Sequence, residues 1–419
     1  MKRIFTLLTA VFVASLLVPC AKAQYTVKTL VNFNTGGAGS NPESSLVFDA
    51  AGSLYGTTAE QTNVFQLSPN SDGTWTENVL WTSAGGSDPS NIRPGIVFDS
   101  AGNIYATSYN GGTIGCGTVF KLTHNSGGNW SESNLVSFGC GFNNDDLNGA
   151  LPVGGVTLDS AGNLYGGTTQ GGTGNNGVIY QLTPNSDGSY TENVIHNFTG
   201  GNDGAYPDHP FLIFDSKGNL YGSAALGGEG NCTLFGTSTC GTIFEMTPQS
   251  GGTWSFKVIH TFTGGTDGGN PEGTLVFDKS GNLYGTTYSG GQYGFGVAFK
   301  LIPHANGKWG ETVLHAFNDK GGDGTNPLGG VIFDSAGSLY GTTTYGGTDQ
   351  CFNAPGCGVV YKLTPKSSGG TTETILARFH GAPNNGPYND LLMDGLGNIY
   401  GTCTGYNTYS NGSVYELIK

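Results

Sequence analysis

The chain has 419 residues, of which 74 are glycine and only 11% are charged, and its formal net charge is -14. This length allows one to three domains, and an acidic chain with so few lysines and arginines is a poor partner for nucleic acid or anionic lipid. Abundant glycine and aromatic residues, without a block of helix-forming residues, favour an all-β fold of short strands and tight turns.

Residues 1–23 differ from the rest of the chain. Lys2 and Arg3 precede an apolar stretch from Ile4 to Val18, and an Ala-Lys-Ala run supplies the small residues that a leader peptidase needs. This pattern predicts a secretory signal peptide, followed by a single domain over residues 24–419.

Cys20 makes lipidation the alternative, but Pro19 stands where a small residue is expected before a lipidated cysteine. No later segment approaches the roughly 20 apolar residues of a spanning helix. We therefore expect a secreted or periplasmic protein without a membrane span. Association with the cell surface stays open.

The first segment after the leader, Tyr25–Phe33, has the composition of a β-strand. It matches Trp309–Phe317, which closes a repeat unit much later in the chain. The last strand of a unit therefore stands ahead of the first complete unit.

One turn then recurs along the chain. The stretch FDKSGNLYGTT at residues 277–287 has close copies throughout, and their spacings of 50 to 63 residues are typical of repeat architectures. The first aspartates of the seven copies are Asp49, Asp99, Asp159, Asp215, Asp278, Asp334 and Asp394. Because Asp can accept local amide hydrogen bonds and Gly can take positive φ, we expect a structural β-hairpin at each copy.

Each unit contains four strand-like runs, a to d. In the fifth unit they are Thr274–Asp278, Leu283–Thr287, Val297–Pro303 and Trp309–Phe317. Runs rich in Val, Ile, Phe, Tyr and Thr between Gly, Asn and Asp are the expected signal of strands and hairpins.

The final unit stops after its strand c, at Val414-Tyr415, while the unmatched strand d is Tyr25–Phe33. A closed ring needs this exchange, because the first strand then completes the last sheet. We predict a seven-bladed β-propeller of four-stranded antiparallel blades, closed by the N-terminal strand. An open solenoid would need capping repeats, which the sequence does not contain.

Ring closure also sorts the loops. The d-to-a and b-to-c connections emerge together, and in this sequence they are long, varied and rich in glycine. The a-to-b and c-to-d connections emerge on the opposite side and are short and uniform. We therefore predict that the first side, called the loop-rich face below, is the binding face.

Seven cysteines follow the leader, and export makes disulfides the expected pairing. The predicted pairs are Cys116 with Cys140, Cys232 with Cys240, and Cys351 with Cys357. Cys403 is left over, and we expect a buried thiol. A metal site built from cysteine is disfavoured, because no Cys-x-x-Cys is present.

Several side chains on the loop-rich face are candidates for ligand binding. Aromatic residues there offer flat faces for sugar rings or for a protein partner, although packing of the long loops is an equal alternative. The candidate ligand-binding residues are Tyr109, Tyr206, Asp208, His209, Tyr288, Tyr293, Tyr345 and Phe352.

Asp203, Asp267 and Asp323 recur in Gly-x-Asp-Gly turns, and Asn148 takes the matching place in another unit. Turn chemistry alone can explain them. Calcium is the functional alternative, because carboxylates among backbone carbonyls suit a hard cation. No other cofactor is implied.

His196, His260 and His315 share one position in strand d. The other units have Asn32, Trp81, Val136 and Arg378 there. Because equivalent positions in different blades lie far apart, we expect an outer-edge structural position and no shared metal cluster.

No catalytic residues can be assigned from motifs. Gly172–Gly177 fits G-x-G-x-x-G but links two strands without a following helix, and neither G-x-S-x-G nor H-E-x-x-H occurs.

The repeat unit resembles the GloVer tandem repeat of bacterial surface and exported proteins. Tyr190–Gly204 and Phe299–Thr343 carry the words Tyr-Thr-Glu-x-Val, Gly-x-Asp-Gly and Asp-x-x-Gly-x-Leu-Tyr-Gly-Thr-Thr most clearly. The resemblance covers essentially the whole mature chain and implies an exported repeat protein. It brings no established reaction and no catalytic residues.

Two hypotheses follow. The first is a non-enzymatic, monomeric exported propeller that binds a glycan or a protein through its loop-rich face. The alternative is a carbohydrate-active hydrolase or lyase that uses Asp203, Asp208 or Asp145 together with His209. Propellers host both kinds of function, so the fold cannot decide between them.

Overall fold

A computed structural model describes residues 25–33, 39–93, 95–140, 147–208, 212–230, 232, 239–347, 356–381, 386–405 and 411–418. The predicted signal peptide, residues 1–23, lies outside these ranges.

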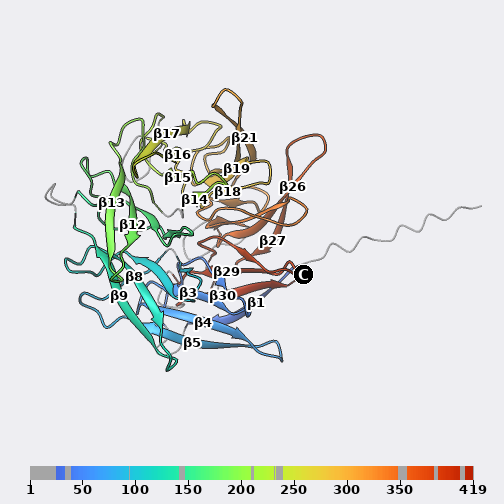
Figure 1. Ribbon diagram of the computed structural model, residues 1–419. Coiled ribbons are helices and arrows are strands. Elements are labelled where there is room, and N and C mark those ends of the chain that lie inside the picture. Colours follow the sequence, from blue (N-terminus) through green and yellow to red (C-terminus); the bar gives the residue numbers. More distant parts are fainter. Residues whose placement is uncertain are drawn as a thin grey trace, which may run out of the picture.

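Seven four-stranded antiparallel sheets form the blades of a β-propeller, as predicted (Figure 1). Blades 1 to 4 comprise β2–β5 (Val47–Phe48, Leu54–Thr58, Asn63–Pro69, Trp75–Thr82), β6–β9 (Val97–Phe98, Ile104–Ser108, Thr118–His124, Trp130–Ser137), β10–β13 (Thr157–Leu158, Leu164–Thr168, Val178–Pro184, Tyr190–Asn197) and β14–β17 (Ile213–Phe214, Leu220–Ala224, Thr242–Pro248, Trp254–Thr261). Blades 5 to 7 comprise β18–β21 (Val276–Phe277, Leu283–Thr287, Val297–Pro303, Trp309–Ala316), β23, β24, β26 and β27 (Ile332–Phe333, Leu339–Thr343, Val359–Pro365, Thr371–Arg378), and β28, β29, β30 and β1 (Leu392–Met393, Ile399–Cys403, Ser413–Ile418, Thr26–Asn32). A short extra pair, β22 (Gly324–Thr325) and β25 (Tyr345–Gly346), joins two loops of blade 6. The described part of the chain contains no helix that could cross a membrane.

The ring closes through the two ends of the described chain. β1 pairs antiparallel with β30, beginning with Thr26 opposite Ile418, and Figure 1 shows the blue first strand beside the red last strands. The hydroxyl of Thr402 in blade 7 also donates to the carbonyl of Ser44 in blade 1, at 3.2 Å. The predicted strand exchange is therefore confirmed.

The repeated turn forms the a-to-b hairpin. In blade 5, Asp278 Oδ1 accepts the amides of Ser280 at 2.8 Å and Asn282 at 3.0 Å, and Oδ2 accepts the side-chain amide of Asn282 at 2.7 Å and the hydroxyl of Tyr284 at 3.0 Å. Gly281 takes a φ of 79°, which favours glycine. One carboxylate thus fixes the whole hairpin.

Other residues of the repeated turn pack against neighbouring strands, both in the adjacent blade and in their own. The ring of Phe277 lies edge-on to Tyr221 of blade 4, with the ring centroids 5.0 Å apart. Gly285 approaches the Phe299 ring so closely that a Cβ would lie only 2.7 Å from it. Seven clusters of buried hydrophobic residues each join two neighbouring blades, so the core lies between the sheets.

Strand a is shorter than predicted. In blade 5 it covers only Val276–Phe277, where the sequence suggested Thr274–Asp278. The preceding chain packs against blade 6 instead of its own sheet, since a Cβ on Gly330 would meet the carbonyl oxygen of Thr274 at 2.1 Å.

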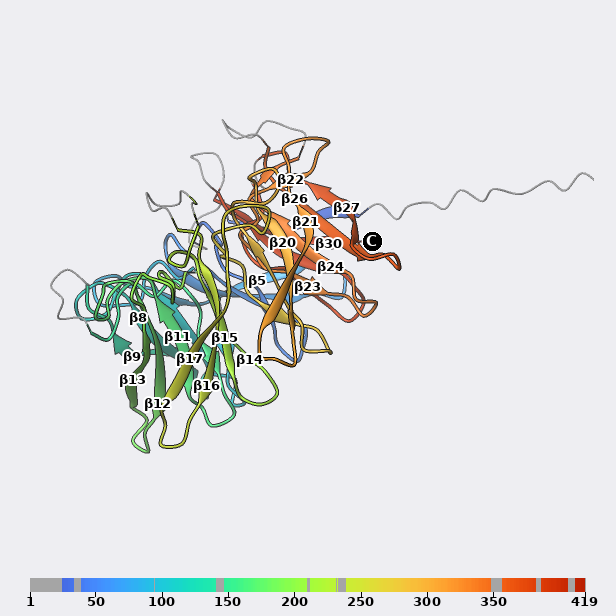
Figure 2. The same cartoon turned by 90° about the horizontal axis from the view of Figure 1, so that it is seen from above.

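The loops divide between two faces as predicted. Bridges such as Ser90 to Asn110 and Gly269 to Ser289 join the d-to-a connection of a blade to its b-to-c connection. The tight hairpins that link β12 to β13 and β16 to β17 extend away from these loops (Figure 2).

Two of the three predicted disulfides are seen on the loop-rich face. The two disulfides within the described residues are Cys116–Cys140 and Cys232–Cys240, with Cα separations of 5.1 and 5.0 Å. Cys357 is disulfide-bonded as well, and its predicted partner Cys351 falls outside the described residues. Cys403 is a buried thiol, as expected.

Candidate functional site

A cavity of about 520 Å³ opens on the loop-rich face and is called the mouth cavity below. Residues from six of the seven blades line it, so it lies at the mouth of the ring. They are Arg93, Tyr109, Val153, Thr169, Gln170, Tyr206, Asp208, Glu272, Tyr288, Leu328, Thr344, Tyr345 and Tyr388. This volume is within the usual range for a small-molecule site.

One position of the repeat supplies much of this lining. It lies at the end of each d-to-a connection, and in six of the seven units it directly follows a proline. Its residues in blades 1 to 7 are Glu43, Arg93, Val153, Asp208, Glu272, Leu328 and Tyr388. All but Glu43 line the mouth cavity, and Glu43 makes an ion pair with Arg93 at 3.4 Å.

The residue two places earlier holds the loop in place. In six blades it is a non-glycine residue in the left-handed region, with φ from 53° to 58°. In blade 5 this residue is Asn270, whose amide donates to Cys240 O of the preceding blade at 2.7 Å and whose carbonyl accepts the amide of Tyr288 at 2.9 Å. The same backbone staple therefore presents a different side chain from each blade.

Four of these six left-handed residues are asparagine, and the other two are Leu151 and Tyr206. Asn is well suited to this conformation, whereas a tyrosine is strained by about 1 kcal/mol. Tyr206 nevertheless adopts a φ of 53° and lines the mouth cavity. Strain kept at a cavity wall is a feature typical of binding sites.

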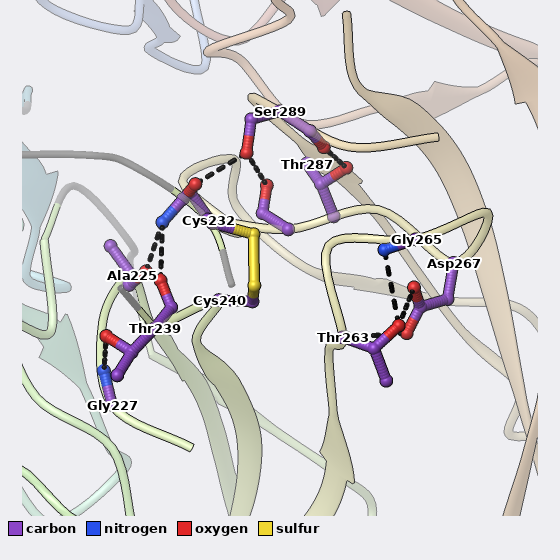
Figure 3. The surroundings of a disulfide bond; sticks show 12 residues. Ala225, Gly227, Cys232, Thr239, Cys240, Thr263, Gly265, Asp267, Thr287 and Ser289 are labelled. Atoms are coloured by element: carbon purple, nitrogen blue, oxygen red, sulfur yellow. Dashed lines mark hydrogen bonds between the residues drawn. A yellow bond between two sulfur atoms is a disulfide. The ribbon is translucent and has the colours of Figure 1, made fainter. Parts of the chain in front are cut away.

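The Cys232–Cys240 disulfide supports the loop that carries Glu272 (Figure 3). A Cβ on Gly269 would lie 2.3 Å from the sulfur of Cys232, so backbone and disulfide are in close contact. Asn270 Nδ2 donates to the carbonyl of Ala225 at 2.9 Å. This disulfide thus buttresses one side of the mouth.

The mouth cavity is lined by both charged and aromatic side chains. The guanidinium of Arg93 lies 5.3 Å from the ring centroid of Tyr109, a cation–π geometry. Burial, followed by the nearby Tyr345 and Glu272, raises the pKa of Tyr288 to about 12, so this phenol stays neutral and can donate a hydrogen bond. Asp208 and Glu272 are both buried.

The structure brings together five of the eight predicted ligand-binding residues: Tyr109, Tyr206, Asp208, Tyr288 and Tyr345. Tyr293 is 51% exposed and is not among the lining residues. His209 and Phe352 lie outside the described residues.

Sequence reasoning missed Arg93, Glu272 and Tyr388 as cavity residues. Aligning the position at the end of each d-to-a connection would have found them, because that position varies in chemistry while its surroundings repeat.

The Gly-x-Asp-Gly aspartates act within their turns. Asp267 accepts the amide of Thr263 at 2.8 Å and its hydroxyl at 2.6 Å, and Asp203 contacts Thr199 in the same way. Asp323 accepts the amides of Asn318 and Gly324. Calcium at these turns stays a prediction.

The strand d position of the histidines needs a correction. β-Sheet register places Ala377 opposite Val360, as His315 lies opposite Ala298, so the residue of blade 6 is Ala377 and not Arg378. By the same criterion Val31, opposite Val414, replaces Asn32 in blade 7. A slip of one residue matters because it moves a side chain to the other face of the sheet.

The histidines also have acidic neighbours that the sequence did not reveal. Each outer strand places its side chains against the outer strand of the next blade. His260 of β17 lies 3.8 Å from Glu311 of β21, and His315 of β21 lies 3.5 Å from Glu373 of β27.

Burial between blades perturbs these glutamates. It raises the pKa of Glu311 to about 8, with Asp267 adding to the effect, and raises the pKa of Glu373 as well. In blade 3 burial raises the pKa of Glu192 to about 7, against a hydrogen bond from Asn148 at 3.2 Å that lowers it.

Two grooves on the opposite face, of about 1040 and 700 Å³, are larger than the mouth cavity. They are lined by a-to-b hairpins, with Asp49 and Tyr55 in one and Asp278 in the other, and by c-to-d hairpins, as at Trp309 in the second groove. Because these residues recur in nearly every blade for structural reasons, the grooves are weaker candidates for a specific site.

Comparisons with known proteins point to one family. A family model described as the Gloeobacter/Verrucomicrobia repeat matches residues 18–235 and 230–415. No curated protein matches the chain.

Solved structures share the fold at low identity. An ancestral GH74 enzyme has a TM-score of 0.57 at 14% identity, over 94% of this chain and 51% of that chain. The extracellular domain of a one-component system from B. thetaiotaomicron gives 0.54 at 13%, over 94% and 40%. A protein from Lactobacillus plantarum gives 0.50 at 12%, over 81% and 85%. The chain thus spans about half or less of the first two, and these likenesses concern the fold alone.

Proposed function

The chain belongs to the Gloeobacter/Verrucomicrobia repeat family, and we propose that it is an exported binding propeller that takes a glycan in its mouth cavity. The observation that carries the proposal is the set of five tyrosines lining that cavity: Tyr109, Tyr206, Tyr288, Tyr345 and Tyr388. Tyrosine supplies a flat apolar face and a hydroxyl at a low entropic cost, which suits the C–H faces and hydroxyls of a sugar ring.

Polar groups in the same cavity support a neutral, hydroxyl-rich ligand. Arg93 is tied to Glu43 at 3.4 Å and to Asn91 at 3.0 Å, so its charge is partly neutralised. Asp208 and Glu272 are acceptors that would repel an anionic ligand. Buried carboxylates and amides are the usual partners of sugar hydroxyls.

Export is part of the proposal. We propose that residues 1–23 are removed and that residues 24–419 act as one monomeric domain. The disulfides support an oxidising compartment. N-terminal sequencing of the mature protein and size-exclusion chromatography would test both points.

The binding test starts with the purified chain on a glycan array. Affinity for each hit is then measured by calorimetry for the parent, Tyr288→Ala and Tyr345→Ala, with Tyr293→Ala as the matched control outside the cavity. We expect the first two variants to bind about 5- to 150-fold more weakly, since a stacking ring contributes about 1 to 3 kcal/mol, and the control to bind like the parent. An array without hits, or equal losses in all three variants, would refute the glycan site. A protein ligand would then be sought.

A second candidate is a carbohydrate-active hydrolase or lyase. Asp208 and Glu272 stand at equivalent positions of neighbouring blades and line one cavity, and glycoside hydrolysis uses two carboxyl groups. Of the acids first considered, Asp203 is held in its turn away from the cavity, and Asp145 lies outside the described residues.

Incubating each array hit with the parent and with Asp208→Asn separates the two candidates. Product released by the parent but not by the variant would favour the enzyme. Binding by the parent without any product would eliminate it.

A further inference from the structure

Two groups of three side chains lie outside the mouth cavity, where the outer strands of neighbouring blades meet. They are His260, Asp267 and Glu311 between blades 4 and 5, and His315, Asp323 and Glu373 between blades 5 and 6. Each group, called a rim triad below, combines a histidine of one blade, the aspartate of the following turn and a glutamate of the next blade.

The spacing of the donor atoms suits a small cation. Within each rim triad the nitrogen and the two carboxylate oxygens all lie within 4.8 Å of one another. His315 Nε2 is 3.1 Å from Asp323 Oδ2 and 3.5 Å from Glu373 Oε1, and His260 Nε2 is 3.8 Å from Glu311 Oε2. Ligand atoms around a tetrahedral zinc ion with bonds of about 2.0 to 2.2 Å are separated by about 3.3 to 3.6 Å.

Several of these atoms are buried without a hydrogen-bond partner among the described residues. They are His260 Nε2, Glu311 Oε1 and Glu373 Oε1. Leaving buried polar atoms unsatisfied costs free energy, and such atoms in a native structure point to a missing ion or water.

Supporting contacts hold the ligands in position. Asp267 is fixed by the amide and hydroxyl of Thr263 (Figure 3), and the ring of His260 lies edge-on to Phe262 with centroids 4.5 Å apart. Outer contacts of this kind preorganise metal ligands.

The repeat provides an internal control. Between blades 3 and 4, His196 and Asp203 are present, 3.4 Å apart, but Phe256 replaces the glutamate and stacks on His196 at 3.7 Å. A metal site there would lack its third ligand.

We propose that each rim triad binds one divalent transition-metal ion of the zinc type, through one imidazole nitrogen and two carboxylates. The histidine selects against calcium and magnesium, which prefer all-oxygen ligands. The ion then links two neighbouring blades on their outer side.

The test uses the untagged full chain, stripped with a chelator and titrated with Zn²⁺ by calorimetry, with bound metal measured after dialysis. We expect two equivalents for the parent, one for His260→Gln, one for His315→Gln, and two for the matched control His196→Gln. A parent that retains no zinc, or an equal loss in His196→Gln, would overturn the proposal.

Two further measurements guard against misfolded variants and adventitious binding. Glu311→Gln changes one ligand without altering volume, and it must also lose one equivalent. Zn²⁺ must raise the melting temperature of the parent by several degrees but not that of the His260→Gln, His315→Gln double variant. Displacement of zinc by excess Ca²⁺ would contradict the zinc-type assignment.

Discussion

The two faces of the ring differ in how far their residues vary from blade to blade. On the hairpin side, one aspartate makes nearly the same hydrogen bonds in all seven blades, as Asp49 and Asp278 illustrate. At the mouth, one equivalent position holds an arginine, three acids, two aliphatic residues and a tyrosine. The constant face reveals what every blade needs to fold, and the varied face reveals where side chains are free to serve a ligand.

This difference between the faces does not come from the backbone, because the loops at the mouth repeat their backbone conformation as regularly as the hairpins do. The left-handed residue recurs with φ near 55° whether it is Asn41 or Tyr206. Variation is therefore confined to side chains, as in other sites that rigid scaffolds carry on their loops. If this division is correct, substitutions on the hairpin side lower stability and substitutions at the mouth lower affinity.

The largest effect is expected on the hairpin side, from Asp278→Ala. Four hydrogen bonds to this carboxylate would be lost, which lowers the free energy of unfolding by about 3 kcal/mol. Ligand affinity at 25 °C stays unchanged. Urea denaturation measures the loss of stability, and Lys279→Ala in the same exposed hairpin is the control. A cost below about 1 kcal/mol for Asp278→Ala would contradict the structural role of the hairpin side.

The stability difference between the parent and Asp278→Ala should disappear at acidic pH. Burial raises the pKa of Asp278, but hydrogen bonds from Asn282 and Tyr284 outweigh it and leave the pKa below the ordinary value. The stabilisation is therefore present above the unfolded pKa near 4 and is lost as pH falls through the folded pKa. Parent and variant curves should converge on acidification.

The double variant Cys232→Ser, Cys240→Ser tests whether a change on the loop-rich face can lower both the stability and the ligand affinity. Opening this loop should cost about 2 to 3 kcal/mol of stability. Because the disulfide supports the loop that carries Glu272, we also expect weaker ligand binding. Unchanged affinity would show that the mouth holds its shape without the disulfide.

A third region lies between the blades. There the pH dependence of stability should be opposite to that of the hairpins, because stability falls as pH rises. Burial raises the pKa of Glu192 to about 7, so the folded state favours the protonated acid. Stability from this group is complete below its unfolded pKa near 4.5 and falls as pH rises towards 7. Glu192→Gln should abolish this fall and be about 2 kcal/mol more stable than the parent at pH 8. The exposed Glu229→Gln is the control, and parallel pH curves for parent and Glu192→Gln would contradict the burial argument.

The smallest effect on stability is expected at the mouth. Tyr345 is 36% exposed, so Tyr345→Ala should change the free energy of unfolding by less than about 0.5 kcal/mol while it weakens ligand binding. A large stability loss without a change in affinity would instead assign Tyr345 to loop packing.

Much of the fold could be predicted because the sequence repeats it. Strands b and c of the fifth unit have the predicted bounds, and strand d differs by one residue at its end. Strand a was overestimated, because contact with the next blade, as at Gly330, is not visible in the local pattern.

The sites were harder to predict because they depend on pairs of blades. The tyrosines could be found by residue type, but Arg93 and Glu272 appear as site residues only after the units are aligned in three dimensions. The rim triads require knowing that Glu311 of one blade faces His260 of another, which depends on register and on the bulge in strand d.

The closure of the ring by β1 and β30 also governs how the protein can fold. The two strands come from opposite ends of the described chain, so β1 keeps an unpaired β-edge until β30 has been synthesised. Such a high contact order makes the final step slow compared with the formation of single hairpins. Until the ring closes, blade 7 is therefore the point at which aggregation competes with the native state.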